Sequence, residues 1–176
     1  MRIAFLLSAL SALSTITTSS AVPRNDSVDG SVVDYHQDTP STNVHHVPIT
    51  RTDCTGYPLD KEDYIAAKNN MVSWSNNGGK IRYKSYHKEM YPKDTINSGV
   101  TWYVCNCKWF YRDKVPQWEI DDVERALTKK CGELQSGSVW SKKWRKAFNV
   151  VPTAWFADAI VHEKPVCPSH CLLYGQ

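Results

Sequence analysis

Two histidines, an acid and an arginine are the residues of this sequence whose types suit catalysis. His87 and Glu89 lie at the end of one β-like run, His162 lies in the last apolar run, and Arg145 lies between them. Cleavage of RNA without a metal needs a base for the 2′-hydroxyl proton, an acid for the leaving oxygen and a cation for the phosphate. These four residues supply all three roles if the fold brings them together. The alternative, which we favour, is that both histidines are ordinary surface residues.

A second set of residues suits binding. Basic side chains can bind nucleic acid by charge while aromatic ones stack on bases, and the same combination can contact anionic lipid or an acidic partner. Residues 138–150 contain no acid, and Trp140, Trp144 and Phe148 recur there at helical spacing. We therefore expect a short helix that buries the aromatic residues and leaves the cations solvated. The candidate binding residues are Trp140, Lys142, Lys143, Arg145 and Lys146.

The cysteines predict a disulfide framework. An even number of cysteines in an exported chain favours disulfides over a zinc site, although a metal site that includes His170 is conceivable. Cys105 and Cys107 share one face of a β-like run, so each is expected to reach a different partner. Cys131 lies on the apolar face of a predicted helix, and one of those two cysteines is its expected partner. The six cysteines are Cys54, Cys105, Cys107, Cys131, Cys167 and Cys171.

The N-terminal residues predict export. Arg2 precedes an apolar run at 3–13 that is too short to span a bilayer, and Ser19-Ser20-Ala21 suits a signal peptidase. We expect a signal peptide at 1–21, the alternative being a membrane anchor. No later segment predicts a transmembrane span, so the mature protein is expected to be secreted and soluble.

The residues that follow differ from the rest of the chain. Residues 22–51 contain no cysteine or tryptophan and predict a disordered pro-segment or linker that is mildly acidic. Asn25 begins a glycosylation sequon there. Arg51 is a possible processing position, and an unprocessed tail is the alternative. Residues 52–176, mildly basic, are expected to form a single disulfide-stabilised domain.

Capping and periodicity predict the elements of that domain. Asp60 suits the start of a helix that ends at Gly78-Gly79, and residues 116–131 predict a second helix. Residues 81–85 and 100–111 predict strands, and residues 155–161 predict a further one. Pro152 is expected to end the short helix before it. The order predicts an α+β fold, with a small antiparallel sheet and two to three helices packed on it.

Four short motifs between residue 54 and about residue 151 carry a resemblance to known proteins. They are Gly78-Gly79-Lys80-Ile81, Tyr103-Val104-Cys105-Asn106-Cys107, Lys130-Cys131-Gly132 and the Trp140/Trp144 pair. In these motifs the run resembles small secreted cysteine-rich proteins of filamentous fungi, of the effector and killer-toxin-like kind. The resemblance implies a role outside the producing cell, often in colonising a host. A second set, Tyr83, His87, Glu89, Arg145 and His162, resembles the site of secreted fungal guanyl-specific ribonucleases.

Three functions follow from these features. The first is a secreted effector or toxin-like protein, without cofactor or metal, that acts in virulence by binding a host or competitor molecule. A protein is a more expected partner than nucleic acid or glycan, and uptake into host cells is left open. The second is a secreted ribonuclease-like enzyme, which requires His87 and His162 to converge in one pocket. The third is a cell-wall glycan-binding protein that uses exposed tryptophans.

Overall fold

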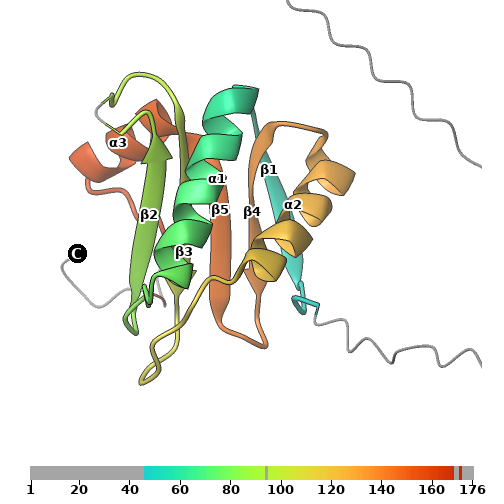
Figure 1. The fold of residues 1–176 in the computed structure, drawn as a ribbon, viewed down its shortest axis with the longest axis vertical. Coiled ribbons are helices and arrows are strands. Elements are labelled where there is room, and N and C mark those ends of the chain that lie inside the picture. The colour runs from blue at the N-terminus through green and yellow to red at the C-terminus, as the bar shows by residue number, and fades with distance from the viewer. Residues whose placement is uncertain (1–45, 94, 169–170, 172–176) are drawn as a thin grey trace, which may run out of the picture. The chain divides into compact units, whose positions relative to one another are not determined.

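A computed structural model describes residues 46–93, 95–168 and 171. The predicted signal peptide, the sequon at Asn25 and most of the predicted pro-segment lie outside the described residues. Within them, the predicted α+β class is confirmed (Figure 1). The elements are β1 (Arg51–Pro58), α1 (Lys61–Asn76), β2 (Ser85–Tyr91), β3 (Val100–Asn106), α2 (Gln117–Cys131), β4 (Gln135–Ser141), β5 (Lys146–Pro152) and α3 (Thr153–Val161).

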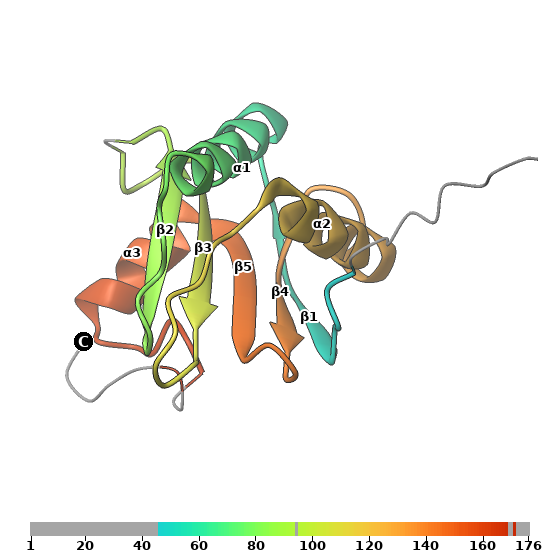
Figure 2. The same ribbon diagram turned by 60° about the horizontal axis from the view of Figure 1, so that its bottom comes forward.

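The strands form one antiparallel sheet in the order β1-β4-β5-β3-β2. Helices α1 and α2 cover one face, which we call the front, and α3 lies on the opposite face, the back (Figure 2). Because successive side chains of a strand point to opposite faces, the central strands supply two separate cores.

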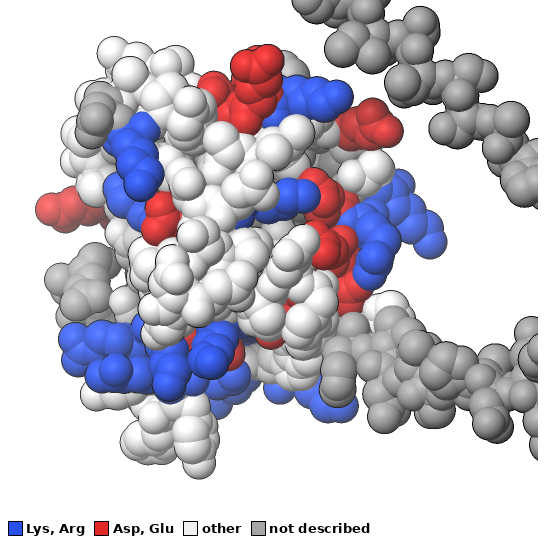
Figure 3. All heavy atoms as spheres, in the orientation of Figure 1, with Lys and Arg blue, Asp and Glu red and all other residues white. Residues whose placement is uncertain are grey.

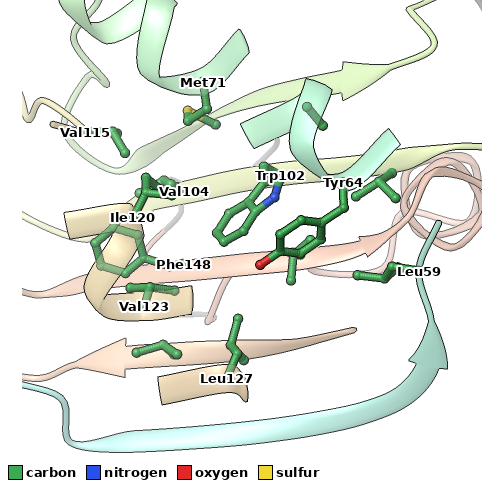
Figure 4. Close-up of a cluster of buried hydrophobic side chains, with 14 of the residues drawn as sticks. Leu59, Tyr64, Met71, Trp102, Val104, Val115, Ile120, Val123, Leu127 and Phe148 are labelled. Atoms are coloured by element: carbon green, nitrogen blue, oxygen red, sulfur yellow. The ribbon is translucent and has the colours of Figure 1, made fainter. Parts of the chain in front are cut away.

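The front core is the larger of the two (Figure 4). Trp102 lies at its centre, and the ring of Tyr64 on α1 packs edge-on against it with centroids 5.5 Å apart. The Asp60 side chain begins α1 as predicted, since it accepts hydrogen bonds from the backbone N–H groups of Glu62 and Asp63. From α2, Ile120, Val123 and Leu127 complete this core.

The back core is built around Phe156 of α3. Its ring contacts Tyr103 of β3, with centroids 5.0 Å apart. Two disulfides join β3 and the residue that follows it to the C-terminal segment, Cys105–Cys167 and Cys107–Cys171. The back face is therefore closed by one short helix and two covalent links.

Two strand predictions were misplaced. The strand expected at 81–85 starts only at Ser85, because Ile81 makes an isolated bridge to Asp113 instead of joining the sheet. The run expected to be extended over 100–111 leaves the sheet after Asn106. The three aromatic residues that follow are exposed, so their β propensity reflects side-chain type and not position in the sheet.

Two predictions in the last third were wrong. The helix expected over 140–148 is the β4–β5 hairpin, in which Trp140 lies on the back face and Phe148 on the front. Spacings of four residues are shared by a helix face and by a strand–turn–strand segment. The strand expected over 155–161 is α3, and Pro152 begins this helix instead of ending one. Short apolar runs such as this one do not separate helix from strand.

The disulfide pairing confirms one expectation and corrects another. Cys105 and Cys107 do reach different partners. Cys131, however, pairs with Cys54 of β1 and not with either of them. The reason is that α2 packs on the front face, whereas Cys105 and Cys107 belong to the back core.

Residues 46–51, placed by the sequence in the pro-segment, pack against this fold. Val47 is buried, and its N–H donates to the Asp122 carboxylate at 2.8 Å. The Ser141 hydroxyl donates to the Pro48 carbonyl at 2.9 Å. Among the described residues, no helix is long and apolar enough to cross a membrane.

We predict that the disulfides will be found as the structure pairs them. Tryptic digestion without reduction should give one linked species that joins Cys54 to Cys131. A second species should join the segment 105–107 to residues 167–171, because trypsin cannot cut within either segment. Mass spectrometry of the digest, with a reduced digest as the control, measures this. A peptide that links Cys131 to the segment 105–107 would contradict the pairing.

A second prediction concerns Asp122. Burial raises the pKa of this carboxyl, but hydrogen bonds from the Val47 N–H, His46 and Arg125 outweigh burial and hold the pKa below its ordinary value. The carboxylate therefore stabilises the fold above its unfolded pKa of about 3.9, and this contribution is lost as the pH falls through the lower folded pKa. Asp122→Asn should lower the free energy of unfolding by about 1–3 kcal/mol at neutral pH.

The measurement is urea unfolding of wild type and Asp122→Asn over a series of pH values. The difference between the two proteins should shrink as the pH falls below about 4, because the carboxylate is then protonated in the unfolded chain first and in the folded protein only at lower pH. If the difference in free energy of unfolding stays constant down to strongly acidic pH, the charge of Asp122 does not contribute to stability.

Candidate functional site

His87 and Glu89, two of the residues that the alternative ribonuclease hypothesis requires, lie together on β2. The His87 Nε2 atom is 2.8 Å from Glu89 Oε1, and both side chains are partly buried. The imidazole stacks on the ring of Trp74 from α1, with centroids 3.5 Å apart. This pair therefore faces the front of the sheet, where α1 covers it.

The other two residues of that alternative hypothesis lie elsewhere. His162 follows α3 on the back of the sheet and contacts Asp158, its Nδ1 atom 3.0 Å from the carboxylate. Arg145 lies in the turn between β4 and β5. The structure thus does not bring His87 and His162 into one pocket, because the sheet separates them.

A dense group of cations gathers at one end of the sheet. We call this surface the basic end and define it as residues 80–84, 107–114 and 142–146. These short segments carry ten Lys or Arg and a single acid, Asp113. In Figure 3 the cations form a band across the lower part of the molecule. The ten cations of the three segments are, by sequence, Lys80, Arg82, Lys84, Lys108, Arg112, Lys114, Lys142, Lys143, Arg145 and Lys146.

Backbone hydrogen bonds hold the three segments of the basic end together. Ile81 and Asp113 exchange N–H···O=C bonds of 2.8 and 2.9 Å. The Cys107 N–H donates to the Arg145 carbonyl at 2.9 Å. Residues far apart in the sequence therefore form one continuous surface.

Asn106, the last residue of β3, anchors the loop that follows. Its side chain is fully buried, and its amide donates to the carbonyls of Ile81 at 3.2 Å and Tyr111 at 2.8 Å. The amide oxygen accepts from the Lys108 N–H at 3.1 Å. A buried amide with these three partners fixes where the loop leaves the sheet.

Three consecutive aromatic residues form the end of that loop, and we call Trp109, Phe110 and Tyr111 the aromatic tip. Their side chains are 51%, 83% and 73% exposed. In Figure 1 the loop between β3 and α2 reaches beyond the end of the sheet, and Figure 3 shows an uncharged protrusion below the band of cations. Three exposed aromatic side chains in one loop make this loop a candidate contact site.

The cations of the basic end fall into two groups. Lys84 is buried, with its Nζ atom 3.8 Å from the centroid of the Trp109 ring. The pKa of Lys84 lies below its ordinary value, because the ammonium group loses hydration and faces Arg145. Lys146 is also buried, and Lys108 is paired with Asp113 at 2.6 Å. The exposed group is Lys80, Arg82, Arg112, Lys114, Lys142, Lys143 and Arg145.

The predicted binding residues are therefore divided. Lys142, Lys143 and Arg145 lie exposed in the basic end. Lys146 is buried, and its Nζ atom is 2.5 Å from Glu119 Oε2. Trp140 faces the back of the sheet, away from the basic end. Sequence reasoning missed the contribution of segments 80–84 and 107–114, although three consecutive aromatic residues flanked by cations over 108–114 were a usable signal.

The described residues contain no group of three or more His, Cys, Asp or Glu side chains that could hold a metal ion. The cysteines, which the sequence also allowed as metal ligands, pair in three disulfides. The chemistry that this surface offers is thus attraction of anions and contact through aromatic rings.

Comparison with known protein families, with curated proteins and with solved structures finds no match to this chain. Its class is therefore defined by its own fold and surface. It is an α+β protein, stapled by disulfides, with a basic end that carries an exposed aromatic tip.

A third prediction concerns the ion pair beneath the basic end. Burial raises the pKa of Glu119, although the Lys146 ammonium opposes this effect. Glu119→Gln removes the nearer carboxylate of the buried Lys146 ammonium and leaves Asp113, 3.6 Å away, as its remaining acidic partner. The free energy of unfolding should therefore fall by about 3 kcal/mol, the lower end for a broken buried pair. The double variant Glu119→Leu/Lys146→Met removes both charges and should lose much less. Urea unfolding of the three proteins tests this, and equal losses in both variants would contradict it.

Proposed function

We propose that this protein is a secreted, non-catalytic effector or toxin-like protein that acts outside the producing cell by binding a host or competitor molecule. The basic end is its binding surface. The observation that carries the proposal is the convergence of exposed cations around an exposed aromatic tip on a hydrogen-bonded framework.

The arrangement of charge supports an anionic partner. The exposed cations of the basic end lie at one end of the sheet and point toward solvent, whereas Asp113, the acid of these segments, is already paired with Lys108. Such a field attracts an anionic partner and raises the rate of encounter. Binding through it should weaken as salt screens the charges.

The separation of the histidines supports binding over ribonuclease activity. His87 pairs with Glu89 under α1, and His162 pairs with Asp158 on α3. General acid–base cleavage needs both groups within hydrogen-bond reach of one phosphodiester. Two histidines on opposite faces of a sheet do not meet this requirement.

A fourth prediction tests the binding surface. Arg112→Glu/Lys142→Glu/Lys143→Glu reverses three exposed charges of the basic end. The matched control Lys61→Glu/Lys93→Glu/Lys129→Glu changes the net charge equally at exposed positions elsewhere. Binding of labelled, disulfide-bonded protein to intact plant, yeast and bacterial cells is measured. On whichever of these cells the wild type binds, the first variant should bind about tenfold more weakly or worse, a change in binding free energy of about 1.4 kcal/mol. The control variant should bind like wild type.

Two results would overturn this function. One is equal binding by both variants and wild type, which would place the binding surface elsewhere. The other is cleavage of RNA by the wild type that a His87→Ala/His162→Ala variant loses, which would make the protein an enzyme.

A further inference from the structure

We propose that the basic end docks on anionic lipid bilayers, with the aromatic tip inserted among the headgroups and the surrounding cations held at the membrane surface. This inference rests on the proposed function, because it takes the basic end as the binding surface and names its partner. The partner is defined by chemistry: a fluid surface of anionic phospholipid with an apolar layer beneath it.

The aromatic tip has the composition and the position of a membrane-inserting loop. Trp109 and Tyr111 are of the two residue types that concentrate at membrane–water interfaces, and Phe110 between them is wholly apolar. Phe110 is the most exposed of the three, at 83%. In Figure 3 an uncharged protrusion extends past the cations, so it would meet a flat surface first.

The cations lie where such a surface would need them. Arg112 and Lys114 follow the tip in sequence, and the turn that carries Lys142 and Lys143 lies beside the loop through the Cys107–Arg145 hydrogen bond. Long cationic side chains behind an inserted apolar tip can reach headgroup phosphates while their stems stay near the interface. The cations would thus contact the anionic headgroups, while the aromatic tip would reach the apolar layer beneath them.

The loop is held in place before any contact occurs. Asn106 fixes both ends of the tip through Lys108 and Tyr111, and the Cys107–Cys171 disulfide pins the strand end behind it. Lys84 supports the Trp109 ring from beneath. A loop that is already ordered loses little conformational entropy when it inserts.

The shape of the basic end favours a bilayer over single-stranded nucleic acid. Proteins that stack successive bases place their aromatic rings along a basic groove. Here the aromatic residues extend outward from the cations, and Lys84 occupies one face of the Trp109 ring. Two cavities of the described residues lie away from the basic end, one between α1 and α2 beside Lys68 and Asp121, and one on the back of the sheet beside Asp53 and Trp140.

The experiment is co-sedimentation of the disulfide-bonded chain 22–176 with vesicles. One set is phosphatidylcholine alone, and the other is phosphatidylcholine mixed with phosphatidylserine. Wild type should sediment with the mixed vesicles only, and added salt should weaken this. Phe110→Ser/Tyr111→Ser removes the two most exposed rings of the aromatic tip, changes no buried side chain and should lower the affinity at least tenfold. Arg112→Glu/Lys142→Glu/Lys143→Glu should do the same, and Lys61→Glu/Lys93→Glu/Lys129→Glu should bind like wild type.

Insertion has its own optical signature. Tryptophan emission should shift to shorter wavelength when the mixed vesicles are added, because the Trp109 ring leaves water. The variant Trp109→Phe should lose this shift while it keeps most of its binding. A shift that persists in Trp109→Phe, or tip variants that bind like wild type, would overturn insertion of the tip.

The outcomes distinguish failure of the lipid-binding inference from failure of the proposed binding function. If wild type ignores anionic vesicles at low salt while the charge-reversed variant still loses binding to cells, the lipid inference fails and the binding function stands. If wild type ignores vesicles but binds polyuridylic acid through the tip, the partner is nucleic acid. If it binds neither vesicles nor cells, both proposals fail.

Discussion

The burial of strand β3 on both faces is the constraint on which the rest of the structure depends. Each residue from Val100 to Asn106 is buried, so alternate side chains must be covered from the front and from the back. Helices α1 and α2 cover the front, where Trp102 lies, and α3 with two disulfides covers the back. The same alternation continues past the strand end. Asn106 turns to the front and anchors the aromatic tip, while the next residue, Cys107, turns to the back and is linked to Cys171.

Charge repulsion within the basic end destabilises the folded state, and the structure shows which of its cations are paired with acids. Ten cations within three short segments repel one another, which disfavours the compact state. Lys146 is neutralised by Glu119 beneath the surface, and Lys108 is paired with Asp113. Burial, and after it the nearby charge of Arg145, lower the pKa of Lys84. Within the part of the chain that the structure describes, the exposed cations have no ion pair of this kind, so the proposed anionic partner would reduce their repulsion.

Local signals predicted the elements that local physics decides. Asp60 begins one helix and Gly132 ends another, and both act through contacts within one helical turn. That Cys105 and Cys107 lie on the same face of the sheet follows from the two-residue period of a strand alone. The partner of Cys131 could not be predicted, since it depends on which face of the sheet α2 covers. The full extent of the basic end could not be predicted either, because it too depends on the tertiary arrangement of the chain. The sequence displays residues 142–146 as an isolated cluster, and only the fold brings segments 80–84 and 107–114 beside it.

The side chains of the aromatic tip do not contribute the free energy of apolar burial to the stability of the fold. Burying apolar surface is worth about 25 cal/mol per Å², and the core residues have already gained it. Phe110 gains almost none of this in the folded chain, because 83% of its surface stays in water. Yet Asn106, buried and satisfied, holds the loop in the position that keeps Phe110 exposed. A fold that rigidly presents apolar rings to solvent stabilises itself no further by doing so. The gain is realised only when a second surface, apolar beneath an anionic layer, takes the rings out of water.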